Sequence, residues 1–508
     1  MLSYVTRKII FLNLFLLIIF SNSHCFSQDS LLSKKFVLNC KKCDLEEIFK
    51  SVERNFDLYL SYPSKIVDLR KTIKFKYTYV TLKEILDSLI KSNDLTYSII
   101  EKQIIIKKNP VINIDSAPFL RIQAQVLEIN SNIPIAYAHV SIVKKPIVTI
   151  TNNDGFFLLI LPYKYINDTL VITCIGYKSL YIPIKDIIQK NTLYLIPDVI
   201  PINEVIIRRN DPIYLINKAI SLIQQNYPTK DFIQTGFYRE TIKKHNEIVS
   251  LTEAIIKCYR KGYSDFNYFL FDNDKIKIEK GRKFISNNIK DSLILKLKGG
   301  LQTILFLDLI KNPPEFLDET KENNYDFFLN DILFNGNEEL YEIIFRQKEY
   351  IKKSLYNGKM YIDVKNMAIT KVNFSLNDKN IEKEWYRFVL KKPDWVKIKP
   401  QKAEYTVIYS QINNKYYPLY AASLVDMKIG NKKSLFQKTY SYIIEAAFME
   451  IDTLNVKPFS TKEIINTSII LENIIDKYED DYWGKYNFIP PDESLLNIIN
   501  SFLSQKNQ

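Results

Sequence analysis

Histidine is scarce in this 508-residue chain, which has 3 of them. A catalytic zinc site needs several histidine and carboxylate ligands close together. His24 falls in the predicted signal peptide, and the other two, His139 and His245, lie about a hundred residues apart with no His-x-x-Glu motif at either. A Gly-x-Ser-x-Gly nucleophile motif and a Gly-rich phosphate loop are also missing from the sequence. We therefore predict no catalytic residues, no bound metal and no cofactor. The 57 Asp and Glu residues leave one enzymatic alternative, a hydrolase with a paired-carboxylate site.

Glycine and cysteine are also scarce, with 11 and 5 residues. Five cysteines are too few for a disulfide scaffold. The low glycine content, with 34 Tyr and 30 Phe residues, favours β-rich folded domains over disorder. The length predicts about three domains.

The N-terminus has the pattern of a secretory signal peptide. Arg7 and Lys8 precede the apolar run "IIFLNLFLLIIF", and a stretch of small and polar residues follows it. The run is short for a bilayer span, which needs about 20 residues. We predict cleavage after Ser27 and export to the periplasm or the periplasmic face of the outer membrane. A lipoprotein acylated at Cys25 and an uncleaved anchor are the alternatives.

The formal net charge is +13, but Lys and Arg residues are interleaved with acidic residues rather than clustered. This distribution is typical of a solvated basic surface and does not favour nucleic acid as a partner.

An internal repeat follows the N-terminal segment. The stretch "DLEEIFKSVERNFDLYLS" begins at Asp44, and "TLKEILDSLIKSNDLTYS" begins at Thr81, an offset of 37 residues (81 − 44). Each copy opens with a helix-capping residue and has a glutamate, Glu47 or Glu84, three residues later. Strand-like runs flank both helices, so we predict two β–α–β units.

The segment from about 36 to 108 resembles the secretin and TonB short N-terminal (STN) domain, through its two "L-x-E-I" helices and the closing "QIIIKK" strand. The resemblance implies a small periplasmic docking domain. Cys40 and Cys43 precede the first helix as Cys-x-x-Cys, which predicts a local disulfide or two free thiols, with a redox pair as the less favoured alternative.

A purely β pattern comes next. In "IAYAHVSIV", Ala138 and Val140 alternate with His139, and "NNDG" after it is a hairpin turn. Short strands with regular turns predict a β-sandwich. The "NNDGFF" turn and the "DTLVITCIGY" strand resemble the carboxypeptidase regulatory-like domain, a transthyretin-like sandwich. That resemblance implies a stiff spacer or docking module without a metallocarboxypeptidase site.

The remainder begins with a helix capped by Asp211 and continues with long strand-like runs. We predict helix on both sides of a break at Gly299–Gly300, and from Tyr325 a meander of antiparallel strands forming a half-barrel. The full layout resembles exported Bacteroidetes proteins that carry a regulatory-like sandwich ahead of a β-rich domain. The fold class is thus multidomain α+β, with four predicted segments: a signal peptide (1–27), an STN-like domain (28–108), a β-sandwich (119–197) and a β-rich C-terminal domain (212–508).

These features predict a non-enzymatic adaptor of the cell envelope. Its expected partners are envelope proteins, including components of a TonB-linked or outer-membrane system. The first alternative is a carrier of a hydrophobic ligand, such as a lipid or lipoprotein, on the half-barrel. The second is an envelope hydrolase. For the C-terminal "DDYWGKYNFIPPDESLL", a tail packed on the half-barrel is favoured over a docking peptide.

Overall fold

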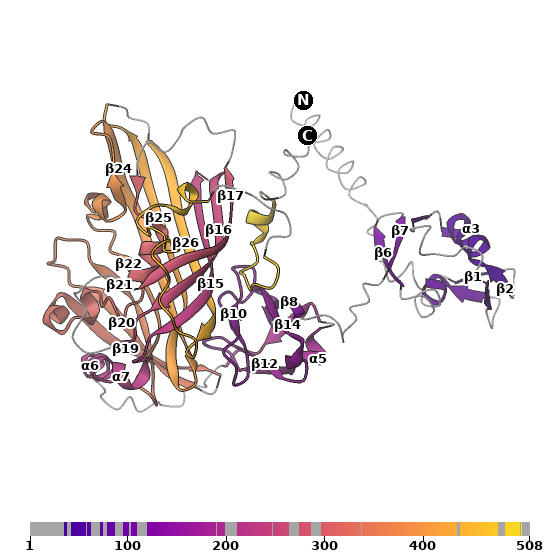
Figure 1. Cartoon of the computed structure of the whole chain (residues 1–508), viewed down its shortest axis with the longest axis horizontal. Coiled ribbons are helices and arrows are strands. Elements are labelled where there is room, and N and C mark those ends of the chain that lie inside the picture. Colours follow the sequence, from indigo (N-terminus) through magenta and orange to yellow (C-terminus); the bar gives the residue numbers. More distant parts are fainter. Residues whose placement is uncertain are drawn as a thin grey trace, which may run out of the picture. The chain divides into compact units, whose positions relative to one another are not determined.

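The computed structural model divides the chain into two compact units, Met1–Ala117 and Pro118–Gln508 (Figure 1). It describes residues 35–37, 42–56, 58–61, 72–74, 79–86, 95–100, 103–108, 119–188, 190–198, 211–245, 247–263, 274–285, 296–336, 338–433, 437–475, 483–497 and 499. The predicted signal peptide and its cleavage site lie outside these residues.

The N-terminal unit has the two predicted helix starts. Helix α3 (Leu45–Phe56) begins after Asp44, whose carboxylate accepts a hydrogen bond of 2.8 Å from the Glu47 amide. The second helical segment, 82–86, has a complete capping box: the Glu84 amide donates to the Thr81 hydroxyl, and the Thr81 amide donates to the Glu84 carboxylate. Its strands form the mixed sheet β3-β7-β6 and the pairs β1-β5 and β2-β4. Their bounds are β1 Lys35–Val37, β2 Lys42–Asp44, β3 Tyr59–Ser61, β4 Thr72–Lys74, β5 Tyr79–Thr81, β6 Leu95–Ile100 and β7 Gln103–Lys108.

The second unit begins with a β-sandwich. One sheet has the order β10-β9-β12-β13 and the other β11-β8-β14. Ala138, Val140 and Ile142 point into the core between the sheets, as their alternation predicts. Gly155 closes the "NNDG" turn at φ +76°, and a Cβ there would lie 2.5 Å from the Val126 carbonyl oxygen. The elements are β8 Phe119–Glu128, β9 His139–Ile142, β10 Val148–Ile150, β11 Phe156–Pro162, β12 Thr169–Thr173, β13 Leu180–Pro183, α5 Ile184–Ile187 and β14 Thr192–Leu195.

A ten-stranded antiparallel sheet makes up most of this unit, in the order β17-β16-β15-β26-β25-β24-β22-β21-β20-β19. The strands before residue 325 belong to it as well, so the sheet is wider than the predicted meander. Its strands are β15 Phe232–Lys244, β16 Glu247–Arg260, β17 Lys275–Ile285, β19 Tyr325–Asn335, β20 Glu338–Gln347, β21 Tyr356–Asp363, β22 Ile369–Leu376, β24 Val396–Ile412, β25 Lys415–Asn431 and β26 Gln437–Asp452.

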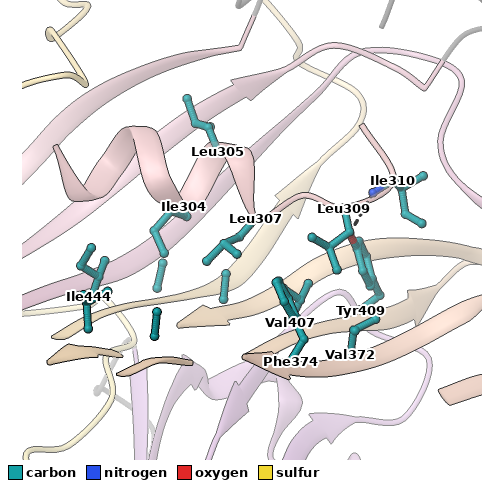
Figure 2. Packing of buried hydrophobic residues seen from close by; sticks show 14 of the residues in the cluster. Ile304, Leu305, Leu307, Leu309, Ile310, Val372, Phe374, Val407, Tyr409 and Ile444 are labelled. Carbon is teal, nitrogen blue, oxygen red and sulfur yellow. Dashed lines mark hydrogen bonds between the residues drawn. The ribbon is translucent and has the colours of Figure 1, made fainter. Parts of the chain in front are cut away.

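Helices cover one face of this large sheet, called here the helix-covered face. They are α6 (Pro212–Ser221), α7 (Ile223–Asn226) and α8 (Gly300–Phe306). The Asp211 carboxylate caps α6 by accepting from the Ile213 amide at 3.0 Å. Figure 2 shows Ile304 and Leu307 pointing from α8 and the turn after it toward the strands.

The segment before α8 corrects one prediction. Lys296–Leu297 form strand β18, paired with β23 (Val389–Lys391), rather than a helix. The carbonyl of Thr467 and the backbone of Ser468 approach Gly299 so closely that a Cβ would lie 2.1 Å from the Thr467 oxygen. Helix α8 therefore begins at Gly300, one residue after the close contact between Gly299 and the backbone of Thr467 and Ser468.

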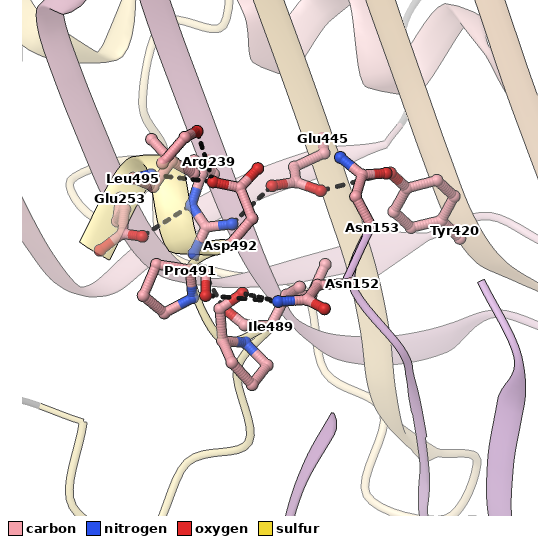
Figure 3. Close-up of polar contacts among 12 residues, drawn as sticks. Asn152, Asn153, Arg239, Glu253, Tyr420, Glu445, Ile489, Pro491, Asp492 and Leu495 are labelled. Carbon is pink, nitrogen blue, oxygen red and sulfur yellow. Dashed lines mark hydrogen bonds and ion pairs between the residues drawn. The ribbon is translucent and has the colours of Figure 1, made fainter. Parts of the chain in front are cut away.

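The sandwich covers the opposite face, called here the sandwich-covered face. Val148 and Ile150 of β10 pack against Phe237, Ala447 and Met449 of the large sheet. The C-terminal segment packs there too, and its Trp483 meets Phe237 edge to face at 5.5 Å. Figure 3 shows this segment beside the sandwich turn and the strands. The sandwich, the large sheet and the C-terminal segment share one apolar cluster. Residues 118–508 therefore form one unit.

Candidate ligand cavity on the helix-covered face

A cavity of about 610 Å³ lies between α8 and the large sheet. The alternation of β26 positions its floor: Tyr442 and Ile444 face the helices, while Ala447 and Met449 face the sandwich. Strands β22, β24 and β25 add Phe374, Tyr405 and Val425 to the lining. The volume lies within the range of small-molecule sites, about 300–1,000 Å³.

Aromatic rings form one wall of the cavity. Phe374 and Tyr405 stack with centroids 4.9 Å apart and an interplanar angle of 23°. The Tyr356 ring meets Phe374 edge-on at 5.3 Å. Phe306 at the end of α8 and Tyr386 in the turn Trp385–Arg387 are half-exposed, which places them at the rim. The wall is thus apolar and wide enough for an alkyl chain or a ring system.

Cationic side chains also line the cavity. The Arg387 guanidinium donates to the Glu384 carboxylate at 2.7 Å and to the Tyr356 hydroxyl at 3.3 Å. Lys353 lies 3.3 Å from the Glu315 carboxylate. Among the described residues, Lys298 has no side-chain hydrogen bond or ion pair to its ammonium group. Burial, followed by the positive charge of Arg387, lowers the pKa of Lys298. An unpaired cation beside a second cation favours an anionic group nearby.

The floor is held in place by a buried carboxylate. The Tyr442 hydroxyl donates to Glu240 at 2.6 Å, and the Tyr238 hydroxyl donates to it at 2.9 Å. The Leu471 amide adds a third bond of 3.1 Å. Burial raises the pKa of Glu240, although its donors oppose that shift. Glu240 fixes the tyrosine rings and is not among the residues that line the cavity.

The residues singled out in the sequence lie elsewhere. His139 lies where the sandwich meets the large sheet, and its Nε2 is 3.0 Å from the Ser410 hydroxyl. His245 lies in the turn after β15 at φ +55°, where its amide donates to the Thr439 carbonyl. Cys40 and the side chain of Cys43 are outside the described residues, so the disulfide or redox pair stays a prediction.

Sequence reasoning missed the cavity residues. Lys298 and Arg387 look like ordinary surface cations in the sequence. One feature of the sequence could have indicated the cavity. In the stretch "WYRF" from Trp385 to Phe388, a cation stands among three aromatic residues outside the predicted long strands. Within the described residues, no group of three or more His, Cys, Asp or Glu side chains could hold a metal ion. No helix there combines the length and apolar character of a bilayer span.

In the comparison with known families, residues 37–106 match a model described as FecR, C-terminal. The matched residues lie within the predicted STN-like module, 28–108, and the matched family is a non-catalytic domain. No curated protein matches the chain.

Similarity to solved structures is distant. A structure titled for lipid–protein interactions in lipovitellin has 8% identity and a TM-score of 0.21, with 46% of this chain and 26% of that chain covered. The Pseudomonas aeruginosa FpvA complex with heterologous pyoverdine has 10% identity and a TM-score of 0.15, with 83% of this chain and 69% of that one covered. Neither match is close enough to inform function.

Proposed function

We propose that this chain is a non-enzymatic binding protein of the cell envelope. Its N-terminal module docks a partner protein, and its C-terminal unit holds an apolar ligand with an acidic end in the cavity beside α8. The observation that carries the proposal is the cavity itself, with stacked aromatic rings on one wall and the unpaired Lys298 within it.

Charge and shape together define the ligand class. Burying an alkyl chain against Phe374, Tyr405 and Ile444 contributes about 0.8 kcal/mol per CH₂ group. A carboxylate or phosphate at the other end would pair with Lys298, whose ammonium otherwise has no partner to offset its partial desolvation. Fatty acids and acidic lipids combine both features.

The docking half of the proposal rests on the FecR C-terminal match to residues 37–106. A partner that belongs to an envelope system, including a TonB-linked one, fits the predicted export of the chain. Deletion of residues 28–108 should remove that partner from a crosslinked pull-down of envelope extract. Retention of every partner by the deleted chain would contradict the docking role.

The ligand half is tested by native mass spectrometry of the full-length chain incubated with palmitate. We expect a one-to-one adduct, and we expect Lys298→Met to weaken it about tenfold through loss of the charge-assisted contact. Lys397→Met is the matched control, because Lys397 is exposed at the start of β24. Hexadecan-1-ol has the same chain length as palmitate but a hydroxyl group in place of the carboxylate. Equal binding of the two compounds would show that no acidic end is recognised.

The wall can be tested separately from the charge. Val425 lines the cavity and is buried, so Val425→Phe should fill space that the ligand needs while adding apolar contacts. Loss of palmitate binding with a retained melting temperature supports the site. Unchanged binding would place the ligand elsewhere.

A further inference from the structure

A second cavity, of about 270 Å³, lies where the sandwich meets the large sheet. We call it the seam cavity. Strands β9 and β12 of the sandwich supply His139, Ser141 and Thr173, and the sandwich-covered face supplies Lys371 and Ser410. It is a different space from the ligand cavity, because the two cavities have different lining residues.

The lining of the seam cavity is rich in polar groups. Hydroxyl and amide groups come from Ser141, Thr173, Ser410, Asn335 and Gln411, and apolar side chains such as Leu340 and Leu419 lie beside them. Tyr181 and Gln411 are exposed, so the cavity is reached from solvent beside them. Polar lining of this kind suits a ligand that carries several hydroxyl groups.

Lys371 is the only lysine among the described residues that line the seam cavity. Its ammonium lies 6.0 Å from the centre of the Tyr361 ring, and no carboxylate of the described residues forms an ion pair with it. Burial lowers the pKa of Lys371. A lysine kept in a polar cavity without a counter-ion is costly unless an anion occupies that cavity at least part of the time.

Glu338 adds a second recognition group. It lies at the start of β20, where the Asn335 amide donates to it at 3.3 Å, and burial raises its pKa. A carboxyl group at this position can accept a hydrogen bond from a ligand hydroxyl. The Ser410 hydroxyl and the His139 ring, 3.0 Å apart, form a further polar edge.

From this arrangement we infer that the seam cavity binds a small polyhydroxylated carboxylate, of the sugar-acid class. Its carboxylate pairs with Lys371, and its hydroxyl groups meet Glu338 and the hydroxyl-rich wall. A volume of about 270 Å³ is the space of roughly nine water molecules at about 30 Å³ each, which is the scale of a small sugar acid. Because the lining comes from both modules, such a ligand would tie the sandwich to the sheet.

The test uses gluconate as probe and sorbitol as its neutral counterpart, which has a hydroxymethyl group in place of the carboxylate. Isothermal titration of the full-length chain should detect gluconate and not sorbitol. Lys371→Met should weaken gluconate binding about tenfold or more. Lys359→Met is the matched control, because Lys359 lies on the neighbouring strand β21 and pairs with Glu342 at 3.0 Å.

A folding defect is distinguishable from loss of a ligand contact. Replacing an unpaired, partly buried cation by an apolar side chain should leave the melting temperature of the free protein unchanged or raise it. A second variant, Ser141→Leu, should block the cavity without touching any charge. Both variants should remove the rise in melting temperature that gluconate gives the parent chain.

The inference is overturned by absence of gluconate binding at millimolar concentration, by equal binding of gluconate and sorbitol, or by equal binding of gluconate by the parent chain and Lys371→Met. Binding of inorganic phosphate in place of gluconate would assign the cavity to a simple anion and also overturn the sugar-acid class. None of these results bears on palmitate binding in the other cavity.

Discussion

The Asn487 side chain pairs with both backbone groups of Ile160, 327 residues earlier in the chain. Its Oδ1 accepts from the Ile160 amide, and its Nδ2 donates to the Ile160 carbonyl at 3.0 Å. Strand β11 is an edge of the sandwich, so these groups have no neighbouring strand to bond. A single amide side chain thus completes the edge and anchors the C-terminal segment.

Asn487→Ala should therefore loosen the tail. Two buried backbone groups would lose their partner, which costs about 1–3 kcal/mol each when no water replaces it. We expect hydrogen exchange at the Ile160 amide to accelerate and the tail to become sensitive to protease. Ser494→Ala, at an exposed site on the same segment, is the control. Unchanged exchange at Ile160 would show that the tail contributes nothing to this edge.

Arg239 is a second anchor of the tail, and Figure 3 shows its contacts. It is buried in β15 and donates to Glu253 and Glu445, each at 2.7 Å, and to the Ile489 carbonyl at 2.8 Å. Arg239→Met leaves Glu445 without its cation and leaves Glu253 with Arg282 alone, so we expect a loss of about 3–5 kcal/mol in unfolding free energy. Arg239→Met combined with Glu253→Gln and Glu445→Gln should recover part of it. A triple variant no more stable than Arg239→Met would contradict this account.

The same cluster gives a pH dependence. Burial raises the pKa of Glu253, but Arg239 and Arg282 outweigh burial and hold it below its ordinary value of 4.5. A lowered pKa contributes stability above the unfolded value and loses it as pH falls through the folded value. The melting temperature should therefore fall as pH drops below about 4.5. Glu253→Gln should reduce that acid dependence while lowering stability at pH 7.

The sequence predicted local features better than long-range ones. The helix N-caps at Asp44, Thr81 and Asp211 could be predicted because each depends on residues within one helical turn. The sandwich was predictable because strands such as β8 and β12 alternate in burial. The extent of the large sheet was not predictable, because β15 pairs with β26 from far along the chain (Arg239 with Glu445), and no local pattern marks such a pairing.

The two cavities were unpredictable for a related reason. Lys298, Arg387 and Lys371 are set apart only by what packs around them, and those neighbours are distant in the chain. In the sequence they are three of 70 basic residues, and no spacing marks them. Burial without a partner is a property of the folded unit, and it is what makes Lys298 and Lys371 informative.

His139 should make stability pH-dependent in a second range. Burial lowers the pKa of His139 to about 4 from an ordinary 6.5. As pH falls, the unfolded chain binds this proton before the folded chain does. The stability that a neutral His139 contributes is therefore fully present above about pH 6.5 and declines as pH falls toward 4, by up to ~1.4 kcal/mol per pH unit. His139→Gln should remove the decline in this window when melting temperature is followed from pH 7 to 4.5. His245→Gln, in a surface turn, is the control, and an equal effect of both would contradict the assignment.

Gly300 should resist replacement by alanine even though it lies in a helix. Intrinsic propensity alone favours alanine in a helix by about 1 kcal/mol. Here the first turn of α8 approaches the sheet so closely that a Cβ would lie 1.9 Å from the Tyr238 hydroxyl, which bonds the buried Glu240. Gly300→Ala must therefore push α8 away from the cavity floor or break that bond, and either change should lower the unfolding free energy and weaken palmitate binding. The double variant Gly300→Ala with Tyr238→Phe removes the obstructing oxygen, so it should restore the position of α8 and part of the binding. If Gly300→Ala alone proves as stable as the parent chain in urea titration, the close approach of α8 to the sheet is not what shapes the cavity.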